Sequence, residues 1–494
     1  MSQIPNLLKI GEIPSNMTME VETSIVEPVV QTESFVRFSL NRSGFLHSNS
    51  KLLLSLDKSS FASFRAQGAE AGDHPSTVPG DAFFPASIGI SNLISRVRLL
   101  SGNTVIQEID DWNFLEAYKA MFVANENNKE KLQYTESKVM NLEFAYDDED
   151  SATSKRSDVK SIGIGLDNGT CYDGSYPDAT GGNGTYDMYA RRCQHISNDP
   201  VYQVNLSSLV PFLKSTQLPL FMFDEQIFLE ITLVSKTDRA VGNSRQMDGD
   251  AVQKALSFAM NQNETRLVVD YISYPEDTMN AWANANKNMS FTYFDYELSK
   301  FTLSDAVATS GFIRNCGGAG KLVTKMICGL SQDMGLNVAN ASILGDFGVV
   351  HPKKDTATSN ESVVTNLRYN DRYLYPITVK NDSYHFNNTL TAEGVPPFVT
   401  RDMFSGQSGN TVARFYNGLG QAATGTGAPN QGLPLNFFWQ SFKLNRNERV
   451  NQKGIELYQQ YLGLEAGVVN TLRIWLEVMK VAQLVDGKLR ASYA

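Results

Sequence analysis

The sequence is short of charge, and this shortage limits the partners it can have. Charged residues make up 19% of the 494 residues, against about 25% in an average soluble protein. Lysine and arginine together number 43 and aspartate and glutamate 53, so the formal net charge is −10. A polybasic clamp for nucleic acid is therefore not expected.

Long apolar runs are also absent, both at the N-terminus and elsewhere. Met1 to Ile10 contains one lysine and lacks the apolar block of about 7 to 15 residues that a secretory signal requires. The most apolar stretch, Leu209 to Phe223, is interrupted by Pro211, Lys214 and Pro219. It falls short of the roughly 20 residues that cross a bilayer. We expect neither export by that route nor a transmembrane segment.

Cysteine is scarce, which argues against a disulfide framework. The four cysteines, at positions 171, 193, 316 and 328, are too few and too unevenly spaced to frame a chain this long. Cys316 and Cys328 have no histidine or second cysteine pair nearby that would complete a zinc site. We interpret the cysteines as free thiols in a reducing compartment.

Motifs of catalysis and of cofactor binding are missing as well. Gly317 to Lys321 reads GGAGK, but a phosphate-binding loop needs glycine where Asn315 stands and serine or threonine where Leu322 stands. The acidic run 147–150 lacks the alternating ligands and the glycine of a calcium loop. No nucleophile elbow is present, and no pair at zinc-ligand spacing occurs among the histidines at 47, 74, 195, 351 and 385. We predict no catalytic, cofactor or metal site, and a protein that is not an enzyme.

What the sequence does contain is a repeated strand signal. In Ser34 to Leu40, the side chains of Val36, Phe38 and Leu40 share the face that we expect in the core. Ser101-Gly102-Asn103 supplies a tight hairpin turn between two such runs. Further strands are expected over 51–56, 94–100, 104–109, 201–206, 218–221, 226–234, 266–274, 289–303, 321–330, 373–379, 436–444, 455–461 and 472–481.

Two short helices are expected between the strands. Asp110 and Asp111 are suited to cap the first, whose apolar side carries Trp112, Leu115, Tyr118, Met121 and Phe122. Pro275 and the acids after it suit the first turn of a second helix running to about Asn286. Proline loses no hydrogen bond at that position, and the acids complement the helix dipole.

These signals predict an all-β protein with two units of comparable size. We expect an N-terminal arm over residues 1–30, a first β unit over 31–274, a connector helix over 275–288 and a second β unit over 289–494. A polar, acidic and glycine-rich stretch over 141–199 is expected as an insertion in the first unit. Loops over 353–362 and 418–432 decorate the second unit.

Five segments of the chain, taken in their order and spacing, resemble a known protein family. They are the strand, glycine turn, strand and tryptophan over 93–112; the pair 218–220 and 225–231; the strand 267–272, which runs into the acidic helix start; and the segments 370–373 and 472–475. Together they resemble the double jelly-roll major capsid proteins of large DNA viruses, virophages and polinton-like viruses, over most of residues 30–494. Polinton-like viruses are the most similar in length and texture.

The resemblance implies two tandem eight-stranded jelly rolls, side by side, with long decorated loops and short helices. It implies a structural protein of the virion, assembled inside the host cell, whose homotrimers have a pseudo-hexagonal outline and tile an icosahedral capsid around a DNA genome. The implied partners are neighbouring capsomers and minor capsid and penton proteins, without direct sequence-specific binding of nucleic acid. The arm, which contains Leu7 and Leu8, is expected on the inner face against minor capsid proteins.

Two other classes stay open. A carbohydrate-binding or glycan-active β-sandwich protein would also use tyrosine, tryptophan and asparagine, and it would need a cleft with paired carboxylates, which the sequence does not place. An adhesive or spike protein would show internal repeats of roughly 20 to 50 residues, and none is visible. A stable trimer of about three times 54.7 kDa would favour the capsid interpretation, and a monomer that binds glycans would favour the sandwich.

Overall fold

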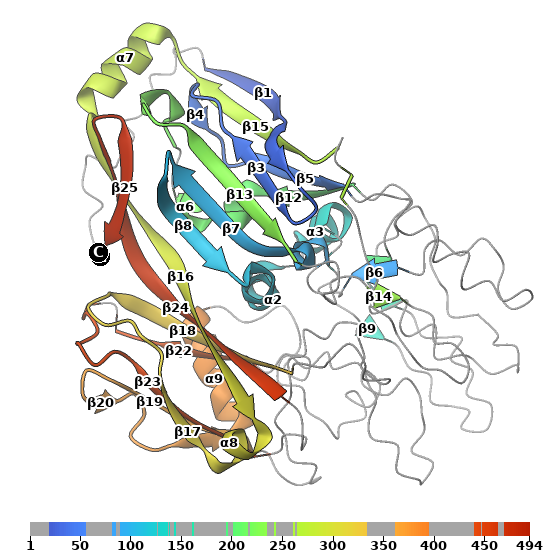
Figure 1. The fold of residues 1–494 in the computed structure, drawn as a ribbon, viewed down its shortest axis with the longest axis vertical. Helices are drawn as coiled ribbons and strands as arrows, with labels where there is room; N and C mark the ends of the chain where they lie inside the picture. The colour runs from blue at the N-terminus through green and yellow to red at the C-terminus, as the bar shows by residue number, and fades with distance from the viewer. Residues whose placement is uncertain are drawn as a thin grey trace, which may run out of the picture.

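The computed structural model describes the chain over residues 19–55, 82–84, 89–125, 127–136, 138, 143–144, 161–162, 194–195, 201–215, 218–234, 242–243, 260–261, 264–332, 361–394, 439–445, 447–462 and 469–494. Over these residues it is built from β-sheets with short helices between them (Figure 1). The all-β prediction is confirmed. Within the same residues, no helix has the length and apolar character that a membrane crossing requires.

The first unit is a sandwich of two antiparallel sheets. One has the strand order β1-β15-β5-β12, with β4 beside β15, and the other has the order β2-β3-β13-β7-β8. The strands are β1 (Glu20–Val26), β2 (Pro28–Gln31), β3 (Phe35–Ser39), β4 (Phe45–Leu46), β5 (Lys51–Ser55), β7 (Ile94–Ser101), β8 (Thr104–Asp110), β12 (Val201–Asn205), β13 (Ile227–Leu233) and β15 (Arg266–Ser273).

The second unit is a sandwich of the same kind. Its sheets have the orders β16-β24-β18-β22, with β25 beside β24, and β17-β23-β19-β20, with β21 beside β19. The strands are β16 (Asn288–Ser304), β17 (Phe312–Asn315), β18 (Val323–Gln332), β19 (Glu361–Tyr369), β20 (Arg372–Tyr373), β21 (Val379–Asn381), β22 (Trp439–Lys443), β23 (Glu456–Tyr461), β24 (Val469–Val485) and β25 (Lys488–Tyr493).

Both units have the same strand order. In the first, β1, β3, β5, β7, β8, β12, β13 and β15, numbered 1 to 8 along the chain, lie in the orders 1-8-3-6 and 2-7-4-5. In the second, β16, β17, β18, β19, β20 or β21, β22, β23 and β24 give the same two orders. This is the jelly-roll arrangement of two Greek keys, and it confirms the prediction of two tandem jelly rolls, which we call the first and the second roll.

Helices and short strands occupy the connections. The helices are α2 (Trp112–Val123), α3 (Lys129–Glu136), α5 (Leu206–Leu209), α6 (Pro211–Ser215), α7 (Glu276–Ala285), α8 (Asp305–Ser310) and α9 (Asp382–Glu393), with 3-10 turns η2 (Gly89–Leu93) and η5 (Leu220–Met222). Short pairs are made by β6 (Ala82–Phe84) with β11 (Gln194–His195) and β14 (Gly242–Asn243), and by β9 (Glu143–Phe144) with β10 (Ser161–Ile162).

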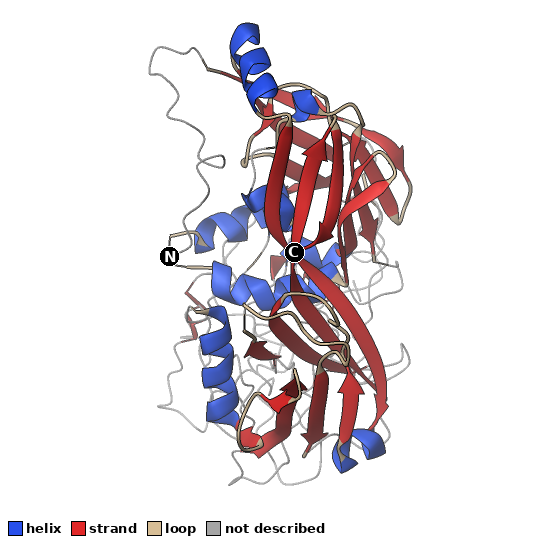
Figure 2. Cartoon of the chain, turned by 90° about the vertical axis from the view of Figure 1, so that its left-hand side faces the viewer, coloured by secondary structure: helices blue, strands red, loops and turns tan. Residues whose placement is uncertain are grey.

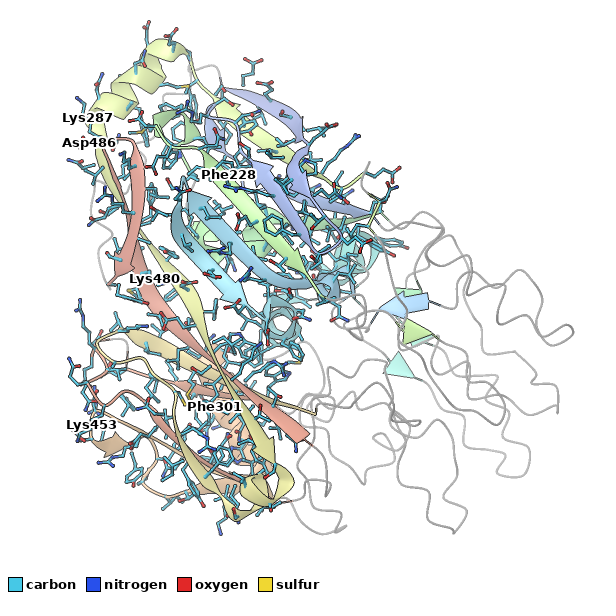
Figure 3. All side chains as sticks on the ribbon, in the orientation of Figure 1. Phe228, Lys287, Phe301, Lys453, Lys480 and Asp486 are labelled. Atoms are coloured by element: carbon cyan, nitrogen blue, oxygen red, sulfur yellow. The ribbon has the colours of Figure 1, made fainter. Side chains whose placement is uncertain are left out.

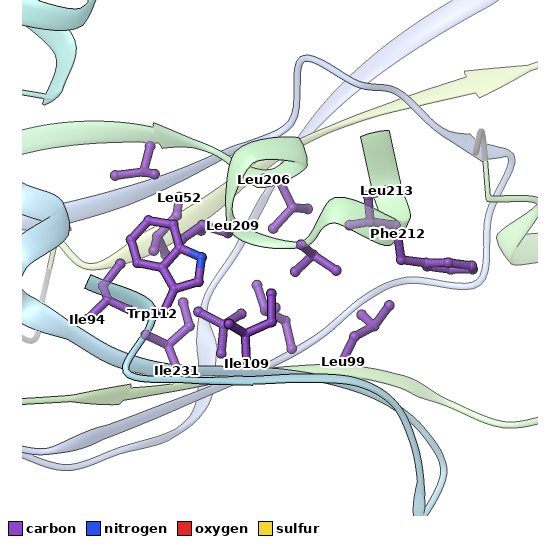
Figure 4. Close-up of a cluster of buried hydrophobic side chains, with 14 of the residues drawn as sticks. Leu52, Ile94, Leu99, Ile109, Trp112, Leu206, Leu209, Phe212, Leu213 and Ile231 are labelled. Carbon is purple, nitrogen blue, oxygen red and sulfur yellow. The ribbon is translucent and has the colours of Figure 1, made fainter. Parts of the chain in front are cut away.

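The core of the first roll is apolar. Leu52, Leu99 and Ile231 face inward from both sheets, because alternate residues of a strand point to opposite faces. The apolar stripe predicted for residues 112–122 lies on α2, and its Trp112 inserts among these side chains (Figure 4). Phe212 on α6 packs into the same cluster. At about 25 cal/mol per Å² of apolar surface, this burial is the main stabilising term of the roll.

Two long strands join the rolls. β16 and β24 pair without interruption from Asn288 with Val485 to Ser304 with Val469. Figure 2 shows these strands passing from one sandwich to the other, with the C-terminus beside the crossing. Tyr293 and Leu484 near their upper ends, and Leu489 on the following strand β25, belong to the core of the first roll. The sequence boundary at 288/289 is therefore not a boundary in space, because the second unit supplies part of the first unit's core.

The predicted arm over residues 1–30 is too long. Glu20 to Val26 pairs with β15, from Glu20 with Ser273 to Val26 with Leu267, and β2 pairs with β3. The pairing satisfies the backbone of this segment, which the sequence pattern alone placed outside the roll. Residues 1–18 lie outside the described part of the chain.

Other boundaries also differ from expectation. The strand expected over 218–221 is reduced to a single bridge between Pro219 and Phe45, and the 3-10 turn η5 begins at Leu220; proline has no backbone N–H to extend a strand pairing. The strand expected over 373–379 is two short pieces, β20 and β21, that flank a turn, and the loop expected over 353–362 ends where β19 begins at Glu361. Further elements were not predicted: the strands β1, β2, β4, β6, β9, β10, β11, β14, β17, β19 and β25 and the helices α3, α5, α6, α8 and α9. The acidic run 147–150, the loop 418–432 and most of 141–199 lie outside the described residues.

The remaining strands and the connector helix agree with expectation to within a few residues at each end. α7 begins at Glu276 after Pro275 and ends at Ala285. The predicted hairpin turn at Ser101-Gly102-Asn103 joins β7 to β8. Gly102 has φ +56 there, and a Cβ would lie 3.2 Å from the Glu225 carboxylate, so glycine is required.

Candidate functional site at the junction of the rolls

The junction between the rolls contains clusters of charged side chains, among them the buried Asp295 and Glu477. We use the word junction for the contact of β8, α2 and α6 of the first roll with β16, β18, β24 and α9 of the second. Aromatic side chains form its apolar part: Trp439 lies 5.9 Å from Trp475 and 5.5 Å from Tyr118, measured between ring centroids. Phe212 lies 4.9 Å from Tyr293 in an edge-to-face contact, a favoured geometry for aromatic pairs.

Asp111 connects the end of β8 to both long strands. Its Oδ1 accepts a hydrogen bond from Lys300 Nζ on β16 at 2.7 Å, and its Oδ2 accepts one from Arg473 Nε on β24 at 2.7 Å. The Arg473 guanidinium also lies 3.9 Å from the centre of the Phe114 ring. The prediction that Asp111 caps α2 is wrong: it precedes the helix in a left-handed conformation and makes no side-chain cap. Its carboxylate instead bridges the rolls.

A second cluster is centred on Lys325 of β18. Its ammonium lies 2.9 Å from Glu393 Oε2 on α9 and 3.4 Å from Glu477 Oε2 on β24. Tyr118 of the first roll donates a hydrogen bond to Glu393 Oε1 at 2.5 Å. Burial alone would raise the pKa of Glu477, but the charge of Lys325 and hydrogen bonds from Thr324 and other donors outweigh it, so the pKa is lowered. One lysine therefore pairs with two carboxylates, and its charge helps to keep the pKa of Glu477 low.

A third cluster joins the upper part of β16 to the first roll. Lys480 Nζ lies 2.6 Å from Asp295 Oδ2, and Gln107 Nε2 donates to Asp295 Oδ1 at 3.2 Å. Gln107 in turn accepts from the backbone N–H of Phe212 at 2.9 Å, and Tyr293 donates to the Ile106 carbonyl. Burial raises the pKa of Asp295, against the opposing effect of Lys480. Lys480 is labelled at this position in Figure 3.

The chemistry of the junction is structural. Its carboxylates are paired with lysine or arginine, and those of Glu393, Glu477 and Asp295 also accept hydrogen bonds from tyrosine, threonine or glutamine donors. A general base or a metal ligand needs a free lone pair, and these contacts engage both oxygens of each of the three side chains. Among the residues that the structure describes, no group of three or more histidine, cysteine, aspartate or glutamate side chains is arranged to hold a metal ion.

The candidate motifs of the sequence take up ordinary places in the fold. The Gly317 to Lys321 segment is a turn before β18: Gly320 N–H donates to the Val450 carbonyl and Lys321 Nζ to Glu297 Oε2. Cys316 and Cys328 are buried free thiols. Burial raises the pKa of Cys316 to about 12. Positions 74, 351, 171 and 193 lie outside the described residues, as does the side chain at position 195.

The junction residues were missed because each is an ordinary residue in its own segment. A signal was present in Leu472 to Val481, where Arg473, Glu477 and Lys480 interrupt a strand that is apolar on both faces. Charges at such positions are buried, and buried charges need partners. The sequence does not reveal the partners themselves, because they lie up to 362 residues away.

Comparison with known proteins rests on structure. No family model and no curated protein matches the sequence. A chain in the cryo-EM structure of the Sputnik virophage superimposes with a TM-score of 0.59 at 12% identity, covering 100% of this chain and 92% of that one. The major capsid protein of mavirus superimposes with a TM-score of 0.52 at 9% identity, covering 99% and 93%. The described part of the chain therefore has the double jelly-roll fold of these virophage proteins.

Proposed function

We propose that the chain is a major capsid protein of a DNA virus, located in the virion. Three copies form a pseudo-hexagonal homotrimer, and these trimers tile an icosahedral shell around the genome. The observation that carries the proposal is a duplicated roll of one topology in a chain that matches the mavirus major capsid protein from end to end. Two similar rolls in each of three copies supply the six similar units that a hexagonal outline needs.

The junction supports a mechanical role. Its clusters join elements from both rolls, and β16 and β24 run through it without interruption. Paired strands satisfy their own backbone groups, and the buried ion pairs fix the register of one roll on the other. A subunit that transmits load between neighbours needs this stiffness.

The described carboxylates argue for a structural protein and against the glycan-active alternative. Pairs of described carboxylates come together around a shared cation: Glu393 with Glu477 around Lys325, Glu116 with Glu136 around Lys138, Glu108 with Glu230 around Arg98, and Asp371 with Glu456 around Arg368. Burial alone would lower the pKa of Lys138, but the two glutamates outweigh it and raise that pKa. Glycoside hydrolysis needs one carboxylic acid and one free carboxylate on either side of a bound sugar. Each of these pairs is instead held by one shared lysine or arginine.

The oligomeric state tests the proposal. Purified chain should run as a trimer of about three times 54.7 kDa by light scattering, and electron microscopy should show particles with a six-sided outline. A monomer that binds glycan arrays would contradict the capsid role and support the carbohydrate-binding class.

The proposal also includes the partners of the capsid protein. We infer contacts with neighbouring capsomers and with minor capsid and penton proteins, the last through the residues before β1. The deletion that tests this must stop at residue 18, because Glu20 already pairs with Ser273. A chain lacking residues 2–18 should give soluble trimers that do not assemble into shells with the minor proteins. Normal particles from this chain would rule out the arm. The similarity to polinton-like viruses stays a prediction.

A further inference from the structure

Because the two rolls share one topology, each surface of one roll has a counterpart on the other. At the junction, strand 5 of the first roll (β8) and the helix after it (α2) pack against the strand-1 side of the second roll. Trp475 belongs to this contact, on the opposite face of β24 from the core residues Ile474 and Leu476. The β1 side of the first roll is the counterpart of the strand-1 side of the second roll. The β20 side of the second roll is the counterpart of the β8 side of the first. The two counterparts lie at opposite ends of the molecule (Figure 1).

The first counterpart is the outer face of the β1-β15-β5-β12 sheet. Val21 is 49% exposed and Ile25 60%. They stand opposite Ile272 and Val268 in the register, on the face away from the core residues Leu267 and Val269. On β16, which holds the matching place in the second roll, the outer-face residues Tyr296 and Leu298 stand opposite Glu477 and Trp475 in the register and pack into the junction, where Tyr296 is buried. We call the set Val21, Ile25, Leu53, Val201 and Val268 the strand-1 face.

The second counterpart is the segment from β20 to the start of α9. Tyr373 is 64% exposed, Ile377 72% and Tyr384 43%. The matching elements of the first roll, β8 and α2, bury Ile106 and Tyr118 in the junction. We call Tyr373, Ile377 and Tyr384 the strand-5 edge. Apolar side chains are thus covered where the two surfaces meet within the chain, and exposed where each stands alone.

We propose that the strand-1 face of one copy binds the strand-5 edge of a second copy, in a repeat of the contact that joins the two rolls within one chain. This rests on the proposed function and names the interface of the homotrimer. The two patches differ, so the contact is heterologous and builds a ring when its rotation closes. Their charges are complementary in sum: around the strand-1 face the exposed Glu20, Glu22 and Glu27 outnumber Lys51 and Arg266. Near the strand-5 edge Lys380 is exposed, whereas Arg372 is paired with Glu448 and Lys453 with Asp371.

Substitutions at exposed positions test the interface without emptying the core. The variant Val21→Asp/Ile25→Asp breaks the strand-1 face, and Ile377→Asp breaks the strand-5 edge. Each should lower the mass measured by light scattering from about three times 54.7 kDa to one. Val485→Asp is the matched control, because Val485 is 42% exposed at the end of β24 and belongs to neither patch. It should stay trimeric.

Mixing the two variants identifies the contact as head-to-tail. Each retains one intact patch, so a mixture should form a dimer of one copy of each, about twice 54.7 kDa, that cannot close into a ring. This dimer would also prove that both variants are folded. The interface would be overturned if the variants stay trimeric. It would also be overturned if the wild type is trimeric and the two folded variants stay monomeric when mixed. Either result would leave the capsid proposal standing. A monomeric wild type would overturn both.

Discussion

The two rolls share a strand order and fill their interiors differently. The first roll is filled by aliphatic and aromatic side chains around Trp112. The second contains a buried chain of polar groups: Tyr461 donates to Gln459, Gln459 to Gln440, and Gln440 to His385. The His385 ring then donates from Nε2 to the Val363 carbonyl at 2.7 Å.

The difference teaches that topology does not dictate the chemistry of the core. An apolar core tolerates any side chains of suitable volume. A buried hydrogen-bonded chain is satisfied in one arrangement only, because each unpaired member costs about 1 to 3 kcal/mol. The polar chain holds α9 against β22 and β19, where the second roll would otherwise be open. The two interiors should therefore respond differently to substitution and to pH.

The largest expected effect is in the apolar core. Trp112→Ala should lower the free energy of unfolding of the first roll by about 3 to 5 kcal/mol, because the indole is 1% exposed and its loss leaves a cavity. Hydrogen exchange of β7 and β8 would measure this roll by itself. Trp282→Ala on α7 is the control, and its half-buried ring should cost less. Equal losses would show that Trp112 is not central to the core.

Breaking the junction should cost nearly as much. Lys325→Met leaves Glu393 and Glu477 buried without their cation, and removing one partner of a buried ion pair costs about 3 to 5 kcal/mol. Lys443→Met is the matched control, because Lys443 pairs with Lys325 in the register and is exposed. It should change stability by no more than about 0.5 kcal/mol. Urea unfolding curves of both variants would separate the two outcomes.

The polar chain of the second roll should make stability depend on pH. Burial lowers the pKa of His385 to about 4, although the bond to the Val363 carbonyl favours the charged ring. Between about pH 6.5 and 4 the His385 ring therefore binds a proton in the unfolded chain and stays neutral in the folded chain. The free energy of unfolding should fall by about 3 kcal/mol as the pH falls through this window.

The variant His385→Gln isolates this contribution, because glutamine does not titrate. Thermal melting between pH 4 and 7 should show a shallower slope for the variant than for the wild type, and parallel curves above pH 6.5. Identical slopes over the whole range would mean that His385 titrates equally in the folded and unfolded chain.

The smallest expected effect concerns the bridge between the rolls. Asp111→Asn keeps a residue that tolerates the left-handed backbone and removes the charge that binds Lys300 and Arg473. We expect a loss of about 1 to 2 kcal/mol and a wider separation between the unfolding of the two rolls. Asp486→Asn is the control, since Asp486 has φ 48 and is exposed. A similar loss in the control would attribute the effect to the backbone and not to the ion pairs.

Local pattern explains which parts of the fold were predictable. The strands over residues 34–40 and 266–274 were predicted correctly, because successive side chains of a strand point to opposite faces and every second residue therefore faces the core. The strand β19 was missed, because Glu361 to Tyr369 is buried on both faces over much of its length and its apolar and polar residues therefore do not alternate. Residues 20–26 were placed in an arm because an edge strand exposed on most positions resembles a solvated segment.

The sequence by itself determined the class of protein: strands in two sets, a helix between them, and the absence of catalytic spacing. These follow from interactions between neighbours in the chain, which leave a periodic trace. Tertiary structure alone decided what Asp111, Lys325 and Glu477 do, and which apolar side chains stay exposed at the two ends. Those outcomes depend on partners that the fold brings together from 68 to 362 residues away, and no local pattern encodes such a partner.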